Sequence, residues 1–224
     1  KESRKRYWNE DYYRYWRERV KEANENISDS SSVVKGDSLT AADKSYFSAI
    51  NLLNITEDSS VLEIGCGFGR SVPFLYSKTK NISAIDISEA MIRAARKECR
   101  EYKEVKFAVS EAEKTLYRSN IFDNLICYAV FDALCQKEAL LEMNRILKKD
   151  GTALITGKND NYFVDDREAL IAEGNARQKG HPNSFTDLKK LLEHLGEFGF
   201  ALIDNRFFLR RGDTNKECFE TSMP

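Results

Sequence analysis

Three alternate glycines, Gly65, Gly67 and Gly69, stand directly after an apolar run, with Glu63 two residues before the first of them. The run Val61–Ile64 is typical of a strand buried on both faces of a parallel sheet. Glycine permits positive φ and lets a ligand approach the backbone closely. Residues 70–76 are typical of a helix start. This order of strand, turn and helix predicts a site where backbone N–H groups face a nucleotide-type ligand.

A second chemical group follows at a defined spacing. Asp86 ends a predicted strand over residues 81–86, 21 residues after Gly65. An acid at this distance accepts hydrogen bonds from ribose hydroxyls in Rossmann-like units. The turn does not fit the nicotinamide fingerprint, because Arg70 stands where that motif needs its third glycine. Glu63 at the strand end suits an ammonium group of the ligand better than a pyrophosphate.

The run from Glu63 to Gly69 resembles the first motif of class I S-adenosylmethionine-dependent methyltransferases, and the likeness extends over about residues 58–157 and more weakly to about 209. It implies an α/β, Rossmann-like fold with a seven-stranded, mostly parallel sheet and helices on both faces. It implies S-adenosyl-L-methionine as the cofactor and S-adenosyl-L-homocysteine as the product. Glu111 stands where the family commonly has aspartate. The cofactor-binding residues implied by the resemblance are Glu63, Gly65, Cys66, Gly67, Gly69, Asp86, Ile87, Met91, Glu111, Ala112 and Tyr128.

Residues 1–40 are predicted to form an N-terminal helical cap and a linker. A helix over residues 6–24 carries both tryptophans of the chain, and a loop over 24–40 follows. One face of this helix is aromatic, formed by Trp8, Tyr12, Tyr15 and Trp16. Two interpretations stay open: this face docks the helix onto the domain, or it covers the cofactor and lines the acceptor pocket.

Residues 41–224 are predicted to form the methyltransferase domain. After a helix over 41–53, strands are expected at 61–64, 81–86, 105–109, 121–130 and 152–156, with a helix over 137–148 before the last of these. An acceptor-side insertion is expected at about 158–183, containing a helix over 167–177. A helix over 184–195 and a sixth strand over 200–209 follow. Nothing after Arg211 is apolar enough for a seventh strand, so we expect that strand to be missing and the chain ends to be trimmed.

Two residues are candidates for a catalytic base. Asp132 follows the fourth strand, where many small-molecule methyltransferases of this family carry a histidine, and a carboxylate in a desolvated crevice can have a raised pKa. His181 lies in the insertion between Gly180 and Pro182, whereas His194 is expected to be structural. A mechanism without a base also stays open, because an amine acceptor needs only to lose its own proton before attack.

Composition excludes several classes of protein. Hydrophobic residues make up 42%, charged residues 32%, and the net charge is −1, so no general attraction to nucleic acid or anionic membrane is expected. Five cysteines without metal-ligand spacing predict reduced thiols, no metal site and a cytoplasmic location. Cys66 and Cys135 are interpreted as packing residues and not as nucleophiles. No run approaches membrane-spanning length, and no signal peptide is visible.

The leading hypothesis is an enzyme that methylates an oxygen or nitrogen of a small molecule, a sugar or another metabolite. Methylation of RNA or protein is the first alternative, and the basic groups that could serve it are Arg206, Arg210, Arg211 and the cluster from Lys1 to Arg6. A non-catalytic S-adenosylmethionine-binding module of a longer chain is the second alternative.

Overall fold

The computed structural model describes residues 2–15, 17, 47–160, 167–178 and 180–206. Several predicted features lie outside these residues: the loop over 24–40, Trp16, the C-terminal end of the helix predicted over 6–24, and the N-terminal end of the helix predicted over 41–53. The elements, in chain order, are α1 (Glu2–Arg6), the π-helix η1 (Tyr7–Tyr12), β1 (Val61–Ile64), α4 (Val72–Tyr76), β2 (Ile82–Asp86), α5 (Glu89–Glu98), β3 (Lys106–Val109), β4 (Phe122–Cys127), the 3-10 helix η2 (Phe131–Ala133), α6 (Gln136–Ile146), β5 (Leu147–Ile155), α7 (Arg167–Gln178), α8 (Leu188–His194) and η3 (Leu195–Phe198).

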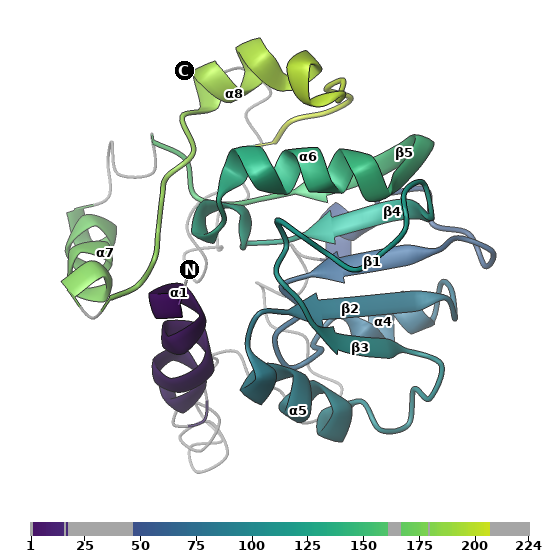
Figure 1. The fold of residues 1–224 in the computed structure, drawn as a ribbon, viewed down its shortest axis with the longest axis horizontal. Helices are drawn as coiled ribbons and strands as arrows, with labels where there is room; N and C mark the ends of the chain where they lie inside the picture. The colour runs from purple at the N-terminus through teal and green to yellow at the C-terminus, as the bar shows by residue number, and fades with distance from the viewer. Residues whose placement is uncertain (1, 16, 18–46, 161–166, 179, 207–224) are drawn as a thin grey trace.

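The five strands form one parallel sheet in the order β3-β2-β1-β4-β5. The chain moves outward from β1 through β2 to β3 and then returns to the other side of β1 with β4. In open α/β sheets, ligands bind at the carboxyl ends of the strands where the order reverses. This point lies between β1 and β4, and Figure 1 shows α1, and farther out α7, on the side of the sheet toward which the strand arrows point.

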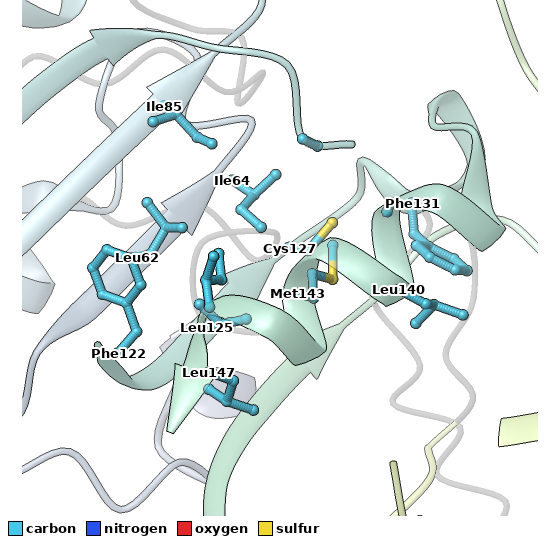
Figure 2. Packing of buried hydrophobic residues seen from close by; sticks show 13 residues of the cluster. Leu62, Ile64, Ile85, Phe122, Leu125, Cys127, Phe131, Leu140, Met143 and Leu147 are labelled. Carbon is cyan, nitrogen blue, oxygen red and sulfur yellow. The ribbon is translucent and has the colours of Figure 1, made fainter. Parts of the chain in front are cut away.

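Alternate strand residues supply two cores on opposite faces of the sheet. Val61, Ile82 and Ile126 pack with Val72 and Leu75 of α4 and with Ile92 of α5. Their neighbours Leu62, Ile85 and Leu125 pack with Leu140, Met143 and Ile146 of α6, and Figure 2 shows part of this second core. The period of two in each strand therefore places helices on both faces, as the Rossmann-like prediction requires.

The prediction of a sixth strand over 200–209 is wrong for its described part, since residues 200–206 are irregular. Leu202 and Ile203 are 53% and 83% exposed. Phe200 alone joins the α6 core, and its N–H donates to the carbonyl of Leu195. A strand needs a ladder partner for its backbone groups, and within the described residues no segment pairs with the outer edge of β5.

Several predicted boundaries also shift, and among them the fifth strand begins at Leu147 and not at residue 152. The fourth strand was expected to reach residue 130, but it ends at Cys127, because Ala129 has a φ of 56° and cannot continue a strand. The helix predicted over 184–195 begins at Leu188, with the Asp187 side chain accepting the N–H of Lys190. Residues 184–186 instead run beside the segment after β5, where Thr186 bridges to Asn159.

Candidate functional site

The glycine turn after β1 is anchored by its neighbour strand. The N–H groups of Gly65 and Cys66 both donate to the carbonyl of Ile85, at 2.8 and 3.0 Å. Gly65, Gly67 and Gly69 have φ values of 73°, 54° and 83°. This left-handed region is costly for any residue with a Cβ, which explains why three glycines alternate here.

The three glycines have different surroundings. A Cβ on Gly65 would come within 2.5 Å of the Val130 side chain, and one on Gly69 within 2.7 Å of Cys99 Sγ. A Cβ on Gly67 would meet nothing within 4 Å. Gly65 and Gly69 therefore permit close packing inside the protein, whereas Gly67 leaves its backbone open to a ligand.

Asp86 lies at the carboxyl end of β2, opposite the turn. Its Oδ2 accepts the Gly67 N–H at 3.0 Å and its Oδ1 accepts the Ser88 N–H at 2.8 Å. Burial raises the pKa of Asp86, although these N–H groups and that of Ile87 act in the opposite direction. A carboxylate has about four acceptor positions, so two hydrogen bonds leave capacity for a pair of hydroxyl groups on a ligand.

Glu63 is 4% exposed and accepts a hydrogen bond from the Ser71 hydroxyl just before α4. The carboxylate therefore ties the end of β1 to the start of the next helix across the turn. Cys66 is also buried, and burial, followed by the charges of Asp86 and Glu63, raises the pKa of its thiol. The interpretation of Cys66 as a packing residue agrees with this environment.

The other expected cofactor residues also lie at or just after the carboxyl ends of the strands. Ile87 follows β2, and Met91 is 3% exposed in the first turn of α5, where its N–H donates to the Ser88 side chain. Glu111 and the buried Ala112 follow β3, and Tyr128 follows β4 and packs against the α4–α5 core. These residues thus follow the carboxyl ends of β2, β3 and β4, of which β2 and β3 are neighbours in the sheet while β1 lies between β2 and β4.

Asp132 lies in η2, after β4, and is 5% exposed. Burial raises the pKa of Asp132, and the charges of Lys158 and His181 lower it in part. The Ser184 N–H donates to the Asp132 carbonyl at 2.7 Å, and Gln136 Nε2 donates to the Ser184 carbonyl at 2.9 Å. The segment that contains His181 is therefore held beside Asp132, so both candidate bases lie in one region of the molecule.

The imidazole of His181 also contacts the N-terminal helix. Its ring centroid lies 5.2 Å from that of Tyr7 and 5.4 Å from that of Trp8, both edge to face. The rings of Trp8 and Tyr12 are 4.7 Å apart, as expected for one aromatic face. The helix was predicted as an ordinary α-helix, but residues 7–12 form a π-helix.

Two N-terminal contacts were not predicted from the sequence. The Arg4 guanidinium pairs with both oxygens of Glu113, and Asn9 Oδ1 accepts the Ala90 N–H at 3.0 Å. The residues of these pairs are 109 and 81 positions apart. In the sequence, Glu113 could be singled out only because it stands two residues after Glu111. Nothing in the sequence indicated that Arg4 would be its partner.

The residues at this edge fit an adenosyl ligand that carries an amino-acid tail. Asp86 offers acceptor capacity suited to a ribose diol, and Gly67 offers open backbone beside it. Among the described residues, no three His, Cys, Asp or Glu side chains gather as metal ligands, and no helix is both long and apolar enough to cross a membrane.

Comparison with known proteins gives a family match over the sheet. Residues 62–155 match the family model described as a methyltransferase domain. Over 173 residues the chain is 27% identical to a malonyl-[acyl-carrier protein] O-methyltransferase of Paenibacillus, covering 72% of this chain and 60% of that protein. Over 182 residues it is 23% identical to the ubiquinone/menaquinone biosynthesis C-methyltransferase UbiE of Campylobacter jejuni, covering 70% and 76%. The first four curated relatives are matched over only 39–60% of their length, about half.

Solved structures share the fold at low identity. Phosphoethanolamine N-methyltransferase 2 of Haemonchus contortus, in complex with S-adenosyl-L-methionine, has a TM-score of 0.60 and 19% identity, with coverage of 70% of this chain and 36% of that one. The [4+2]-cyclase SpnF also has a TM-score of 0.60, with 21% identity and coverage of 77% and 62%. Since the second of these is named for a cyclisation, the fold by itself does not determine the reaction.

Proposed function

Because residues 62–155 match the methyltransferase-domain family model, we propose that the protein is a class I S-adenosylmethionine-dependent methyltransferase that methylates an oxygen or nitrogen of a small molecule. Bound S-adenosylmethionine would supply an activated methyl group for an in-line displacement. The chain's own residues hold the ligand, align the acceptor and, for a hydroxyl acceptor, remove its proton.

The observation that carries this proposal is the position of Asp86 against the glycine turn. One carboxylate oxygen holds the Gly67 N–H, beside backbone that has open space, and acceptor capacity remains for two hydroxyls. We assign the ribose to Asp86, the amino-acid tail to the turn from Glu63 to Gly69, and the adenine to Ile87, Met91 and the segment Glu111–Ala112. Tyr128 is assigned to the methyl-group side.

Titration calorimetry with S-adenosylhomocysteine tests the assignment of Asp86. Hydrogen bonds to a charged group contribute about 1.5–3 kcal/mol each, so Asp86→Ala should weaken binding by at least about tenfold. The exposed Asp58→Ala is the matched control and should bind as the wild type does. Unchanged affinity in Asp86→Ala would contradict the proposed site.

The acceptor side is assigned to Asp132, His181 and the insertion 158–183. Burial raises the pKa of Asp132, which makes its carboxylate a stronger proton acceptor than an ordinary exposed aspartate. For a hydroxyl acceptor, we expect Asp132→Asn to lower kcat by about 10²–10⁴-fold while the affinity for S-adenosylhomocysteine stays unchanged. A base works only when deprotonated, so the wild-type rate should fall as the pH drops through the pKa of Asp132, which lies above its usual value. An acceptor amine should show little loss in Asp132→Asn.

The acceptor is found by incubating the full chain with methyl-labelled S-adenosylmethionine and a metabolite extract, followed by mass spectrometry. A labelled small molecule supports the proposal. Label transferred to RNA or protein, or cofactor binding without turnover, would instead support one of the two alternatives. A net charge of −1 and reduced thiols support small-molecule chemistry in a cytoplasmic setting.

A further inference from the structure

An ion pair joins the N-terminal segment, residues 2–15, to the loop after β3. Arg4 Nη1 and Nη2 donate to the two oxygens of Glu113, at 2.5 and 2.9 Å. The two side chains are 11% and 3% exposed. A bidentate pair in such a sheltered place is stronger and more directional than a surface ion pair. Glu113 also accepts the N–H of Cys135, the residue that precedes α6.

A second anchor lies five residues further along the segment. Asn9 Oδ1 accepts the N–H of Ala90 at 3.0 Å, and the Ser88 hydroxyl lies 3.4 Å away. These two residues are at the N-terminus of α5, immediately after Asp86 and Ile87. Asn9 thereby satisfies an N–H group that has no partner within its own helix.

Residues 4–9 therefore cross from the loop after β3 to the loop after β2. Figure 1 shows α1 at the edge of the sheet toward which the strand arrows point. The residues between the anchors on the domain side are the ones assigned to the nucleoside, namely Asp86, Ile87, Glu111 and Ala112. A nucleoside held by these four residues would therefore lie next to both anchors.

The segment has no fully buried residue in α1 or η1. Its described contacts include the two polar anchors, a hydrogen bond from Arg4 Nη1 to the Ala133 carbonyl and the contacts of Tyr7 and Trp8 with His181. Elements with few buried apolar contacts open locally at low free-energy cost. We therefore expect the polar anchors to contribute strongly to how readily this segment leaves the carboxyl ends of the strands.

We propose that residues 2–15 form a strap that closes over the adenosyl ligand, and that the Arg4–Glu113 ion pair is the latch that must open for the ligand to enter or leave. This inference rests on the proposed function for the identity of the ligand. The ion pair joins α1 to the loop after β3, and through the Cys135 N–H this loop is also joined to the start of α6. When the ion pair opens, the strap is released and the nucleoside becomes exposed to solvent. The contacts of Tyr7 and Trp8 with His181 extend the strap to the acceptor side.

The chain contains a built-in reporter for the strap, because Trp8 and Trp16 are its two tryptophans. In a Trp16→Phe background, Trp8 alone reports the state of residues 2–15 by fluorescence. We expect S-adenosylhomocysteine to protect Trp8 from acrylamide quenching. Without ligand, Arg4→Gln should increase the quenching of Trp8, while the exposed Arg6→Gln should leave it unchanged.

Stopped-flow fluorescence measures the dissociation rate of S-adenosylhomocysteine. Arg4→Gln and Glu113→Gln should each raise this rate by about tenfold, within the usual range of coupling between sites. The amide introduced by Glu113→Gln keeps a carbonyl oxygen for the Cys135 N–H. Because both substitutions remove the same ion pair, the double variant should release S-adenosylhomocysteine no faster than the faster single variant. At the second anchor, Asn9→Ala should also raise the rate, whereas Asn9→Asp keeps an acceptor for Ala90 and should not.

The outcomes separate the two proposals. If the wild type binds S-adenosylhomocysteine but Arg4→Gln and Arg6→Gln release it equally fast, the strap is wrong and the proposed function stands. If the wild type binds no S-adenosylhomocysteine, the proposed function is wrong, and the strap as a cover for that ligand falls with it. Equal quenching of Trp8 in Arg4→Gln and Arg6→Gln would overturn the latch in either case. Circular dichroism of each variant identifies any that fails to fold, and the Asn9 pair then provides the test.

Discussion

At the scale of single residues, the turn after β1 divides its work among glycines that look equivalent in the sequence. Gly69 faces Cys99 Sγ, which would lie 2.7 Å from an added Cβ, whereas Gly67 faces open space. All three have positive φ, so a substitution at any of them is strained. A side chain added at Gly69 would collide with the protein, whereas one added at Gly67 would collide with the bound ligand.

This difference can be measured with two alanine variants. Gly67→Ala should lower the free energy of unfolding by about 1–2 kcal/mol, which is the cost of its backbone conformation. The free energy of S-adenosylhomocysteine binding should fall by more than this amount, because the added methyl group occupies space assigned to the ligand. Gly69→Ala should cost about 2–4 kcal/mol of stability, because overpacking adds to strain. The second change Cys99→Ala should recover only the overpacking part. Urea unfolding checks both, and equal stability of Gly67→Ala and Gly69→Ala would contradict the interpretation.

At the scale of elements, polar ties hold the strands in register at the end of the sheet opposite the site. Asp123 in β4 accepts hydrogen bonds from the Ser60 N–H and hydroxyl before β1, at 2.8 and 2.6 Å. Lys148 Nζ in β5 donates to both Asp123 oxygens, at 2.9 and 2.8 Å. One carboxylate thereby joins three strands, β1, β4 and β5, so its charge state affects the whole sheet.

The stability of the protein should therefore depend on pH through the protonation of Asp123. Burial raises the pKa of this carboxyl, but the bonds from Lys148 and Ser60 outweigh it and lower the pKa to about 2. A folded-state pKa below the unfolded value of about 3.9 stabilises the fold at higher pH, and this stability is lost as the pH falls from about 4 to about 2. Because the side chain is 35% exposed, the contribution is reduced to about 1 kcal/mol.

Asp123→Asn should lower the free energy of unfolding by about 1 kcal/mol at pH 7 and should flatten its pH dependence between about pH 4 and 2. Thermal unfolding followed by circular dichroism at several pH values checks this expectation. Asp58→Asn, at an exposed position, serves as the control. An unchanged pH profile in Asp123→Asn would show that other carboxylates dominate acid unfolding.

At the scale of the whole molecule, folding separates the cysteines into two classes. Cys66, Cys99 and Cys127 are buried, whereas Cys135 is exposed, so the interpretation of Cys135 as a packing residue is wrong. Burial raises the pKa of all three buried thiols, that of Cys99 to about 12. The thiolate is the reactive form, so these three are protected both by burial and by protonation. Cys218 lies outside the described residues.

Brief treatment of the native protein with iodoacetamide should therefore label Cys135 and leave Cys66, Cys99 and Cys127 unmodified, whereas denatured protein should be labelled at all four. Peptide mass spectrometry reads out each site. Glu113→Gln provides a further comparison, since Glu113 accepts the Cys135 N–H. Labelling of Cys66 at the rate of Cys135 in the native state would contradict the observed burial.

Sequence alone determined the features that depend on neighbours in the chain. Three alternate glycines permit a turn with positive φ directly after the first strand, and Asp86 ends a strand because the apolar residues before it favour one. The apolar runs of β1, β2 and β4 are local patterns that predicted buried strands, and the Rossmann-like sheet with helices on both faces, which the family resemblance implied, is confirmed. The helix over 167–177 was likewise predicted nearly as observed.

Only the tertiary structure decided which distant residues meet. The pairing of Arg4 with Glu113, of Asn9 with the start of α5, and of the His181 segment with Asp132 depends on how the elements pack, and no local propensity encodes it. The same reason explains the error at residues 200–206. Their apolar composition favours a strand, but a strand forms only where a neighbour offers its backbone, and packing against α6 determined the place of Phe200.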